Sequence, residues 1–177
     1  WQVAPGRLLL RTHLLLLVTI DGEEWIADVG FGGNTLTAPL RLNERGEQQT
    51  PHEPARLIER DGFLTIQPKI KNEWHDLVAF DLERQNFAEL EMGNWFTSTH
   101  PRSRFRNELF LARSDTGVRY GLLDNMLTTH KLNGATERRT LANAAEIRDS
   151  ITDVFRVRLP NDPQLNATLA RCAEKAA

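Results

Sequence analysis

The first part of the chain carries an apolar pattern typical of a β-hairpin. Residues 8–20 and 23–30 are rich in Leu, Val and Ile, and they flank the dipeptide Asp21-Gly22. That dipeptide suits the two positive φ angles of a type I′ turn. The pattern therefore predicts two antiparallel strands joined by a two-residue turn.

Short strands are expected to continue through the first half of the chain. They are predicted at residues 55–60, 63–70 and 73–80, with Asp61-Gly62 as a second hairpin turn. The intervening residues 31–40 are interpreted as a loop closed by Pro39, and the polar residues 43–54 as an exposed excursion. Regular short strands of this kind favour a small antiparallel β-barrel or sandwich.

After residue 81 the pattern becomes mixed. Residues 82–96 fit a helix and residues 97–105 a loop, and strands are expected again at 108–113, 118–123 and 125–132. The fold class predicted for the whole chain is therefore α+β.

Two helices are predicted near the C-terminal end. Residues 143–155 begin with Asn143 as a helix cap and carry Glu146 at the third helical position. A last helix is expected to start at Pro163. Its apolar stripe consists of Leu165, Leu169, Cys172 and Ala176.

Composition narrows the class of partner. The 177 residues include 22 basic and 24 acidic side chains, a formal net charge of -2, which gives no electrostatic footprint for nucleic acid or an anionic membrane. The longest apolar run, Leu14 to Val18, is too short to cross a bilayer. One cysteine excludes an internal disulfide and a cysteine-rich zinc site. We expect a cytoplasmic protein that binds small molecules. Because the sequence begins at Trp1, close to a core strand, we also expect it to be part of something longer.

One histidine and one aspartate are candidates for chemistry. With the turn at Asp21-Gly22, the hairpin register places His13 opposite Gly30 and diagonal to Asp28 on the same face. An imidazole N–H bonded to a carboxylate is held in one tautomer, as a general base beside a nucleophile requires. A buried histidine paired with an aspartate and performing no chemistry fits the same spacing.

A nucleophile is harder to find. Cys172 lies on the apolar stripe of the last helix, where cysteine is usually a small hydrophobic residue. No serine lies in a Gly-x-Ser-x-Gly elbow. The remaining histidines, without partners at metal-ligand spacing, are His52, His75, His100 and His130. The residues alone indicate a base and its orienting acid without an attacking group, and no metal.

Several segments resemble the arylamine N-acetyltransferases. They are "THLLLLV", "WIADVGFGG" and "APLRL", followed by "NWFTSTHPRSRF", "LLDNMLTTHKLNGATERRTL" and "VFRVRLP". The Asp-Val-Gly-Phe-Gly box, with a histidine 15 residues before its aspartate, is the most specific of these matches. The resemblance implies a cysteine-proteinase-like fold, with a β-barrel domain in residues 1–105 and an α/β lid domain in residues 106–177.

The resemblance also implies an activity used in xenobiotic metabolism. A cysteine thiolate takes acetyl from acetyl-CoA and passes it to an arylamine, arylhydrazine or hydroxylamine, with His13 as base and Asp28 as its orienter. The family's cysteine belongs to an N-terminal helical domain, in an Arg-Gly-Gly-x-Cys setting that these 177 residues lack. We therefore expect the chain alone to be inactive and the N-terminal domain to be its missing partner.

The resemblance assigns other residues to substrates. Phe31 and Phe105 resemble aromatic residues of the acceptor pocket, and ordinary core packing is the alternative for both. Thr12 and Gly32 resemble positions near the pantetheine and phosphates of CoA. Arg102 and Arg104 are candidates for binding the CoA phosphates, and the alternative is that both lie in a solvated loop. Whether the segment "THKLNGA" contacts the cofactor is left open.

Two other functions compete with the acetyltransferase. One is a non-catalytic module, a degenerate homologue that binds CoA or an aromatic ligand in the barrel mouth. The other keeps the Cys-His-Asp chemistry but uses it for hydrolysis or amide cross-linking. The glycine-flanked Phe31 loop favours the acetyltransferase by resemblance.

Overall fold

The structure is a computed structural model that describes residues 12–132 and 134–175. Contacts divide the chain into two compact units, one ending at Thr99 and the other beginning at His100. The boundary expected from the sequence follows residue 105, and the assignment of functional domains stays a prediction. Each unit has its own hydrophobic core. None of the described helices is long and apolar enough to span a membrane.

The predicted hairpin is confirmed at the start of the described chain. Strand β1 (Leu16–Ile20) pairs with β2 (Glu23–Ala27) in the expected register, with Ile20 opposite Glu23. Asp21 and Gly22 have φ angles of 51° and 82°, as a type I′ turn requires. The observed strands are shorter than predicted, and residues 8–11 of the predicted first strand lie outside the described residues.

The first unit contains two antiparallel sheets. One has the order β1-β2-β3, and in the other β5 pairs with β4 on one edge and with β6 and β7 on the other. The bounds of the remaining strands are β3 Leu40–Arg41, β4 Ala55–Arg60, β5 Phe63–Ile70, β6 Glu73–Trp74 and β7 Val78–Phe80. The Asp61-Gly62 turn between β4 and β5 is confirmed, with φ angles of 52° and 78°.

The described strands do not close into the expected barrel. The described strands of the two sheets form separate ladders, and an isolated bridge between Gln48 and Ala55 links the stretch after β3 to β4. The single strand predicted at 73–80 is interrupted between β6 and β7. Pro68 lies opposite this interruption, accepts from the His75 N–H and has no N–H to donate in return.

The polar stretch 43–54, predicted to be wholly exposed, contains one buried anchor. Gln48 is 9% exposed, and its side chain accepts from the backbone N–H of Arg41 and donates to the backbone carbonyls of Arg41 and Glu44. A buried amide is stabilised when its polar atoms are bonded in this way. The excursion is therefore fastened to the end of β3.

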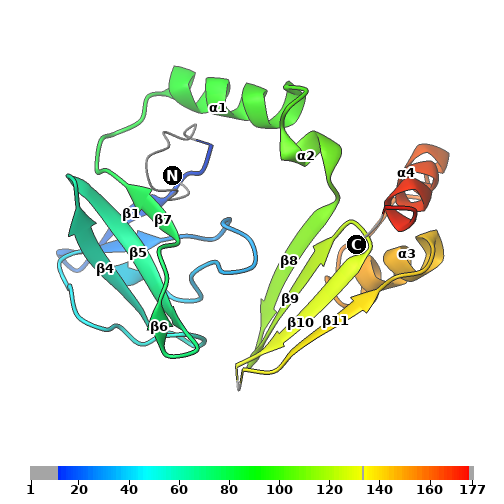
Figure 1. The fold of residues 1–177 in the computed structure, drawn as a ribbon. Helices are drawn as coiled ribbons and strands as arrows, with labels where there is room; N and C mark the ends of the chain where they lie inside the picture. Colours follow the sequence, from blue (N-terminus) through cyan, green and yellow to red (C-terminus); the bar gives the residue numbers. More distant parts are fainter. Residues whose placement is uncertain (1–11, 133, 176–177) are drawn as a thin grey trace. The chain divides into compact units, whose positions relative to one another are not determined.

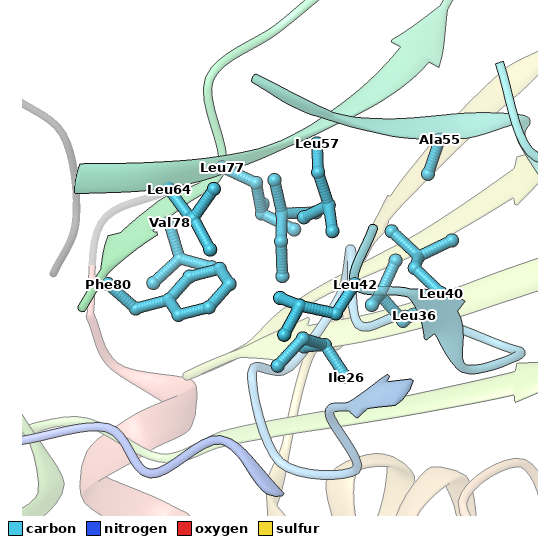
Figure 2. Packing of buried hydrophobic residues seen from close by; sticks show 11 residues of the cluster. Ile26, Leu36, Leu40, Leu42, Ala55, Leu57, Leu64, Leu77, Val78 and Phe80 are labelled. Carbon is cyan, nitrogen blue, oxygen red and sulfur yellow. The ribbon is translucent and has the colours of Figure 1, made fainter. Parts of the chain in front are cut away.

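Both sheets of the first unit contribute to one core. Figure 2 shows side chains of the β2–β3 region, including Ile26 and Leu42, facing Leu57 of β4 and Leu77, which directly precedes β7. Most of these side chains are less than 10% exposed. The buried cluster consists of Ile26, Leu36, Leu40, Leu42, Ala55, Leu57, Leu64, Ile66, Leu77, Val78 and Phe80.

Replacing Leu57 by alanine is expected to lower the free energy of unfolding of the first unit by about 2–5 kcal/mol, because Leu57 is fully buried and a cavity would remain. Urea unfolding followed by tryptophan fluorescence measures this unit, because all four tryptophans precede residue 100. Leu16→Ala is the matched control: Leu16 is 46% exposed, so a change of less than about 0.5 kcal/mol is expected. Equal losses in the two variants would contradict the assigned core.

Helix α1 (Phe87–Thr99) ends the first unit and buries none of its residues. Asn86 and Glu89 form a reciprocal cap, each side chain accepting from the other's backbone N–H. The helix was predicted at 82–96, with a loop from residue 97, but it continues to Thr99. The hydroxyls of Thr97, Ser98 and Thr99 donate to carbonyls one turn earlier, which supports this last turn.

The second unit is a four-stranded antiparallel meander with two helices packed on the sheet (Figure 1). Its elements are α2 Arg104–Asn107, β8 Phe110–Asp115, β9 Val118–Leu123, β10 Met126–Lys131, β11 Thr136–Thr140, α3 Ala144–Asp153 and α4 Pro163–Ala173. Short helix α2 was not predicted, and its first two residues fall at the end of the predicted loop 97–105. Strand β11 was not predicted, because all of its residues are exposed and polar and carry no apolar alternation.

The two predicted C-terminal helices are confirmed. Asn143 caps α3 by accepting from the Glu146 N–H, and Asp162 caps α4 by accepting from the Gln164 N–H. Leu169 and Cys172 of the predicted α4 stripe are buried, whereas Ala176 lies outside the described residues.

Candidate active site

The candidate site begins where the hairpin ladder ends. His13 precedes β1 and Asp28 directly follows β2, and His13 Nε2 lies 2.9 Å from Asp28 Oδ2. The expected contact between them is therefore present. The Asp28 side chain is fully buried, whereas the His13 side chain is 21% exposed. The imidazole thus connects a buried carboxylate with the surface.

Asp28 also fastens the loop that follows it. Its Oδ1 accepts from the backbone N–H groups of Gly30 and Phe31, at 3.0 and 3.2 Å, and its backbone carbonyl accepts from the Thr35 hydroxyl at 3.1 Å. One carboxylate oxygen therefore holds the loop and the other holds the imidazole. The two backbone N–H groups therefore fix the orientation of the buried carboxylate.

This arrangement assigns the histidine tautomer. An ionised carboxylate can only accept, so Nε2 of His13 carries the proton that it donates to Asp28. In the neutral ring, Nδ1 is then the atom able to accept a proton. The contact with Asp28 therefore fixes the orientation of the His13 ring.

Phe31 and Gly30 form the surroundings of the imidazole. The Phe31 ring meets the His13 ring edge to face, with centroids 5.3 Å apart, and also packs against the core of the first unit. A Cβ placed on Gly30 would meet one neighbour, His13 Cε1, at the ordinary contact distance of 3.9 Å. The glycine therefore leaves room beside the imidazole.

A cavity of about 660 Å³ opens beside His13 within the first unit. Its floor includes Leu15, Val78 and Phe80, and residues of α1 such as Leu90 and Phe96 line another side. A mainly apolar space beside a polar, oriented histidine is a common form of small-molecule site. No sequence signal indicated the contribution of α1 to this cavity.

The candidate acetyl-CoA residues lie next to the pair. Thr12 is exposed and lines the cavity together with His13. Gly32 has a φ angle of 104°, a conformation that favours glycine, and a Cβ there would meet no atom within 4 Å. Thr12 therefore lies at the cavity, whereas Gly32 lies in the loop that follows Asp28.

The other candidates belong to the second unit. Phe105 is 57% exposed and packs its ring against Phe110, with centroids 5.0 Å apart. Arg104 forms an ion pair with Glu108 at 2.6 Å, and its guanidinium lies over the Phe110 ring. Arg102 is exposed. The charge of Arg104 is thus partly compensated within its own segment.

Cys172 is a core residue in this structure. It is 5% exposed and packs in the hydrophobic core of the second unit. Burial raises the pKa of its thiol, and the charge of Asp124 raises that pKa further. A nucleophilic cysteine requires the opposite shift toward thiolate. Cys172 therefore does not qualify as the attacking group.

No metal centre is present among the described residues. No three or more His, Cys, Asp or Glu side chains in residues 12–132 and 134–175 form a group that could hold a metal ion. His130 lies in the second unit, with Nδ1 2.7 Å from the Thr136 hydroxyl.

Comparison with known proteins assigns the family. A family model described as N-acetyltransferase matches residues 1–164. The arylamine N-acetyltransferase of Mycolicibacterium smegmatis is 38% identical over 151 residues, which cover 84% of this chain and 54% of that protein. The chain thus spans about half the length of this relative.

Solved structures give the same result. The structure of a variant N-arylamine acetyltransferase from Mycobacterium smegmatis matches with a TM-score of 0.89 and 34% identity, over 98% of this chain and 64% of that one. The Mycobacterium marinum arylamine N-acetyltransferase, solved in complex with CoA, matches with a TM-score of 0.87 and 36% identity, over 96% of this chain and 63% of that one. The chain therefore belongs to the arylamine N-acetyltransferase family.

Proposed function

We propose that this chain supplies the histidine and aspartate of a Cys-His-Asp system that transfers acetyl from acetyl-CoA to arylamines and arylhydrazines. The observation that carries the proposal is the bond from His13 Nε2 to the buried, doubly anchored Asp28 carboxylate. It leaves Nδ1 as the proton acceptor, which is what an adjacent thiol needs.

The reaction then has two halves. In the first, His13 Nδ1 takes the thiol proton, the thiolate attacks the acetyl carbonyl, and the C–S bond to CoA breaks as the CoA sulfur takes up that proton. In the second, the amine nitrogen attacks the acetyl-enzyme thioester, the enzyme thiolate leaves, and the nitrogen gives a proton to the imidazole. Asp28 stabilises the imidazolium that forms in each half. The kinetics are expected to be ping-pong.

The nucleophile is assigned to a segment outside these 177 residues. The single cysteine of the sequence, Cys172, is buried in the second unit and its pKa is raised. The resemblance places the family's cysteine in an N-terminal helical domain, and this chain spans 54% of the M. smegmatis relative. Residues 1–105 would then act as the barrel domain and residues 106–177 as the lid.

Substrate contacts are proposed from the same resemblance. Phe31 touches the His13 ring, so an aromatic acceptor stacked on it would hold its amine near the thioester. Phe105 would supply a second aromatic surface. Thr12, which lines the cavity with His13, and Gly32, in the loop after Asp28, would contact acetyl-CoA. Arg104 is a weaker candidate for the CoA phosphates because Glu108 already pairs with it.

The test is a joined enzyme, in which the N-terminal part of the M. smegmatis relative that this chain does not match is fused ahead of Trp1. We expect it to acetylate a simple arylamine with acetyl-CoA, whereas the 177-residue chain alone shows no acetylation above that without protein. Product is measured by chromatography, with thermal unfolding to establish that each protein is folded. A folded joined enzyme without acetylated product would contradict the proposal.

Cys172→Ala in the joined enzyme is expected to leave kcat/KM within about twofold, because Cys172 is a buried core residue and not the nucleophile. The comparison variant replaces the cysteine of the added segment and should abolish turnover. Loss of activity in Cys172→Ala without loss of thermal stability would instead assign the chemistry to Cys172.

A further inference from the structure

The segment that presents Phe105 is poorly fixed by apolar packing. Its helix α2 has four residues, none of them buried. Phe105 is 57% exposed. Within the described residues, its ring contacts one other aromatic ring, that of Phe110. Because apolar burial contributes little here, polar bonds from other elements must set the position of this segment.

One lysine from the end of the chain reaches this segment. Lys175 Nζ donates to the Asn107 carbonyl at 2.9 Å and to Asp124 Oδ1 at 2.8 Å. The Asn107 amide in turn donates to the carbonyls of Pro101 and Ser103, at 2.7 and 2.8 Å. Lys175 is thereby connected to both sides of Phe105.

The turn between β9 and β10 holds Lys175 in place. Asp124 has a φ angle of 50°, and its Oδ1 also accepts from the Leu109 N–H at 3.0 Å. Asn125 is 4% exposed, and its amide donates to the carbonyls of Ala173 and Lys175, at 3.1 and 3.0 Å. The turn therefore fixes both the chain that follows α4 and the residue that precedes β8.

The charges of this network favour the bonded state. Burial raises the pKa of Asp124, but the hydrogen bonds from Lys175 and the Leu109 N–H outweigh burial, and the net shift is downward. The same Asp124 bond raises the pKa of Lys175. Both groups are therefore ionised at neutral pH, and charge-assisted bonds of this kind are shorter and more directional than neutral ones.

We propose that Lys175, held by Asp124 and Asn125, is a positioning residue that sets the orientation of the Phe105 segment and through it the binding of the arylamine acceptor. The effect on acceptor binding rests on the proposed function, whereas the effect on the segment does not. Because Lys175 acts through Phe105, its loss should change the KM for the arylamine and leave the rate of acetyl-enzyme formation at saturating acetyl-CoA unchanged.

The first experiment measures the segment directly in the 177-residue chain. In Lys175→Met, peptides covering residues 101–109 should exchange their amide hydrogens about threefold to tenfold faster, because the bonds to Asn107 and Asp124 are lost. Lys175→Arg keeps the charge and should stay within about twofold. Lys131→Met, which removes the exposed Lys131–Glu137 ion pair of the same unit, is the matched control and should also stay within about twofold. Unchanged exchange in Lys175→Met would overturn the inference.

The second experiment uses the joined enzyme. Lys175→Met should raise the arylamine KM about threefold to tenfold, with kcat and the rate of acetyl-enzyme formation within twofold, and Lys175→Arg should restore it. Phe105→Ala should raise the same KM, and the double variant should be no worse than Phe105→Ala alone. Additive effects in the double variant would overturn the positioning role. An unsubstituted joined enzyme that acetylates no arylamine would instead overturn the proposed function, and the exchange experiment would decide the inference by itself.

Discussion

Replacing His13 by alanine in the joined enzyme is expected to lower kcat/KM for arylamine acetylation by about a thousandfold to ten-thousandfold. The imidazole is the one group bonded to Asp28 that can take a thiol proton. Without it, a cysteine of ordinary pKa near 8.5 is only about 3% thiolate at pH 7. The acetyl-enzyme also loses the base that accepts the proton of the attacking amine.

The pH dependence of the His13→Ala enzyme separates these two losses. At about pH 9.5 a cysteine of ordinary pKa is roughly 90% thiolate, so acetyl-enzyme formation should recover much of its rate. The transfer to the amine should recover less, because it still lacks a base. Rapid-quench measurement of acetyl-enzyme and steady-state product formation give the two rates.

His75→Ala is the matched control for His13→Ala. His75 is exposed in the same unit and bonds to the Pro68 carbonyl through its backbone N–H, so loss of its side chain should leave kcat/KM within about threefold. A His13→Ala enzyme that keeps more than a tenth of the activity would show that the imidazole is not the base.

The contact between His13 and Asp28 could be predicted because it depends on local rules. The Asp21-Gly22 turn fixes the register, and the two-residue period of a strand then places both side chains on one face. The start of α3 could be predicted from Asn143 for a similar reason, since its side-chain acceptor satisfies an N–H group of the first helical turn, and Pro163 marked the start of α4.

Features that depend on distant partners could not be predicted. Gln48 lies in a polar stretch, and its burial depends on the backbone groups of Arg41 brought next to it by the fold. Strand β11 forms because β10 offers an open edge, although its own residues show no apolar alternation. The sequence also gave no reason to expect α1 beside the histidine, because the helix buries none of its residues.

Substitution of Asp28 by asparagine tests the orienting role and is expected to lower kcat/KM by about a hundredfold to ten-thousandfold. The carboxylate uses one oxygen to bind His13 and the other to bind the Gly30 and Phe31 N–H groups, whereas asparagine has a single acceptor oxygen. If that oxygen serves the Gly30 and Phe31 N–H groups, the amide N–H donates to His13 Nε2 and the ring proton moves to Nδ1. If the oxygen faces His13, the amide NH₂ of the asparagine points at the Gly30 and Phe31 N–H groups, and these two backbone donors lose their acceptor.

Both orientations of the asparagine are unfavourable, but they are distinguishable in the 177-residue chain itself. Nitrogen-15 spectra of labelled histidine, with the His13 signals assigned by their absence in His13→Ala, report which ring nitrogen carries the proton. We expect Nε2–H in the unsubstituted chain and Nδ1–H in Asp28→Asn. Asp76→Asn is the matched control, because Asp76 pairs with Gln67 and Arg60 in the same unit and should change neither tautomer nor kcat/KM. An Nε2–H ring and near-normal activity in Asp28→Asn would mean that the loop, and not the carboxylate, orients the histidine.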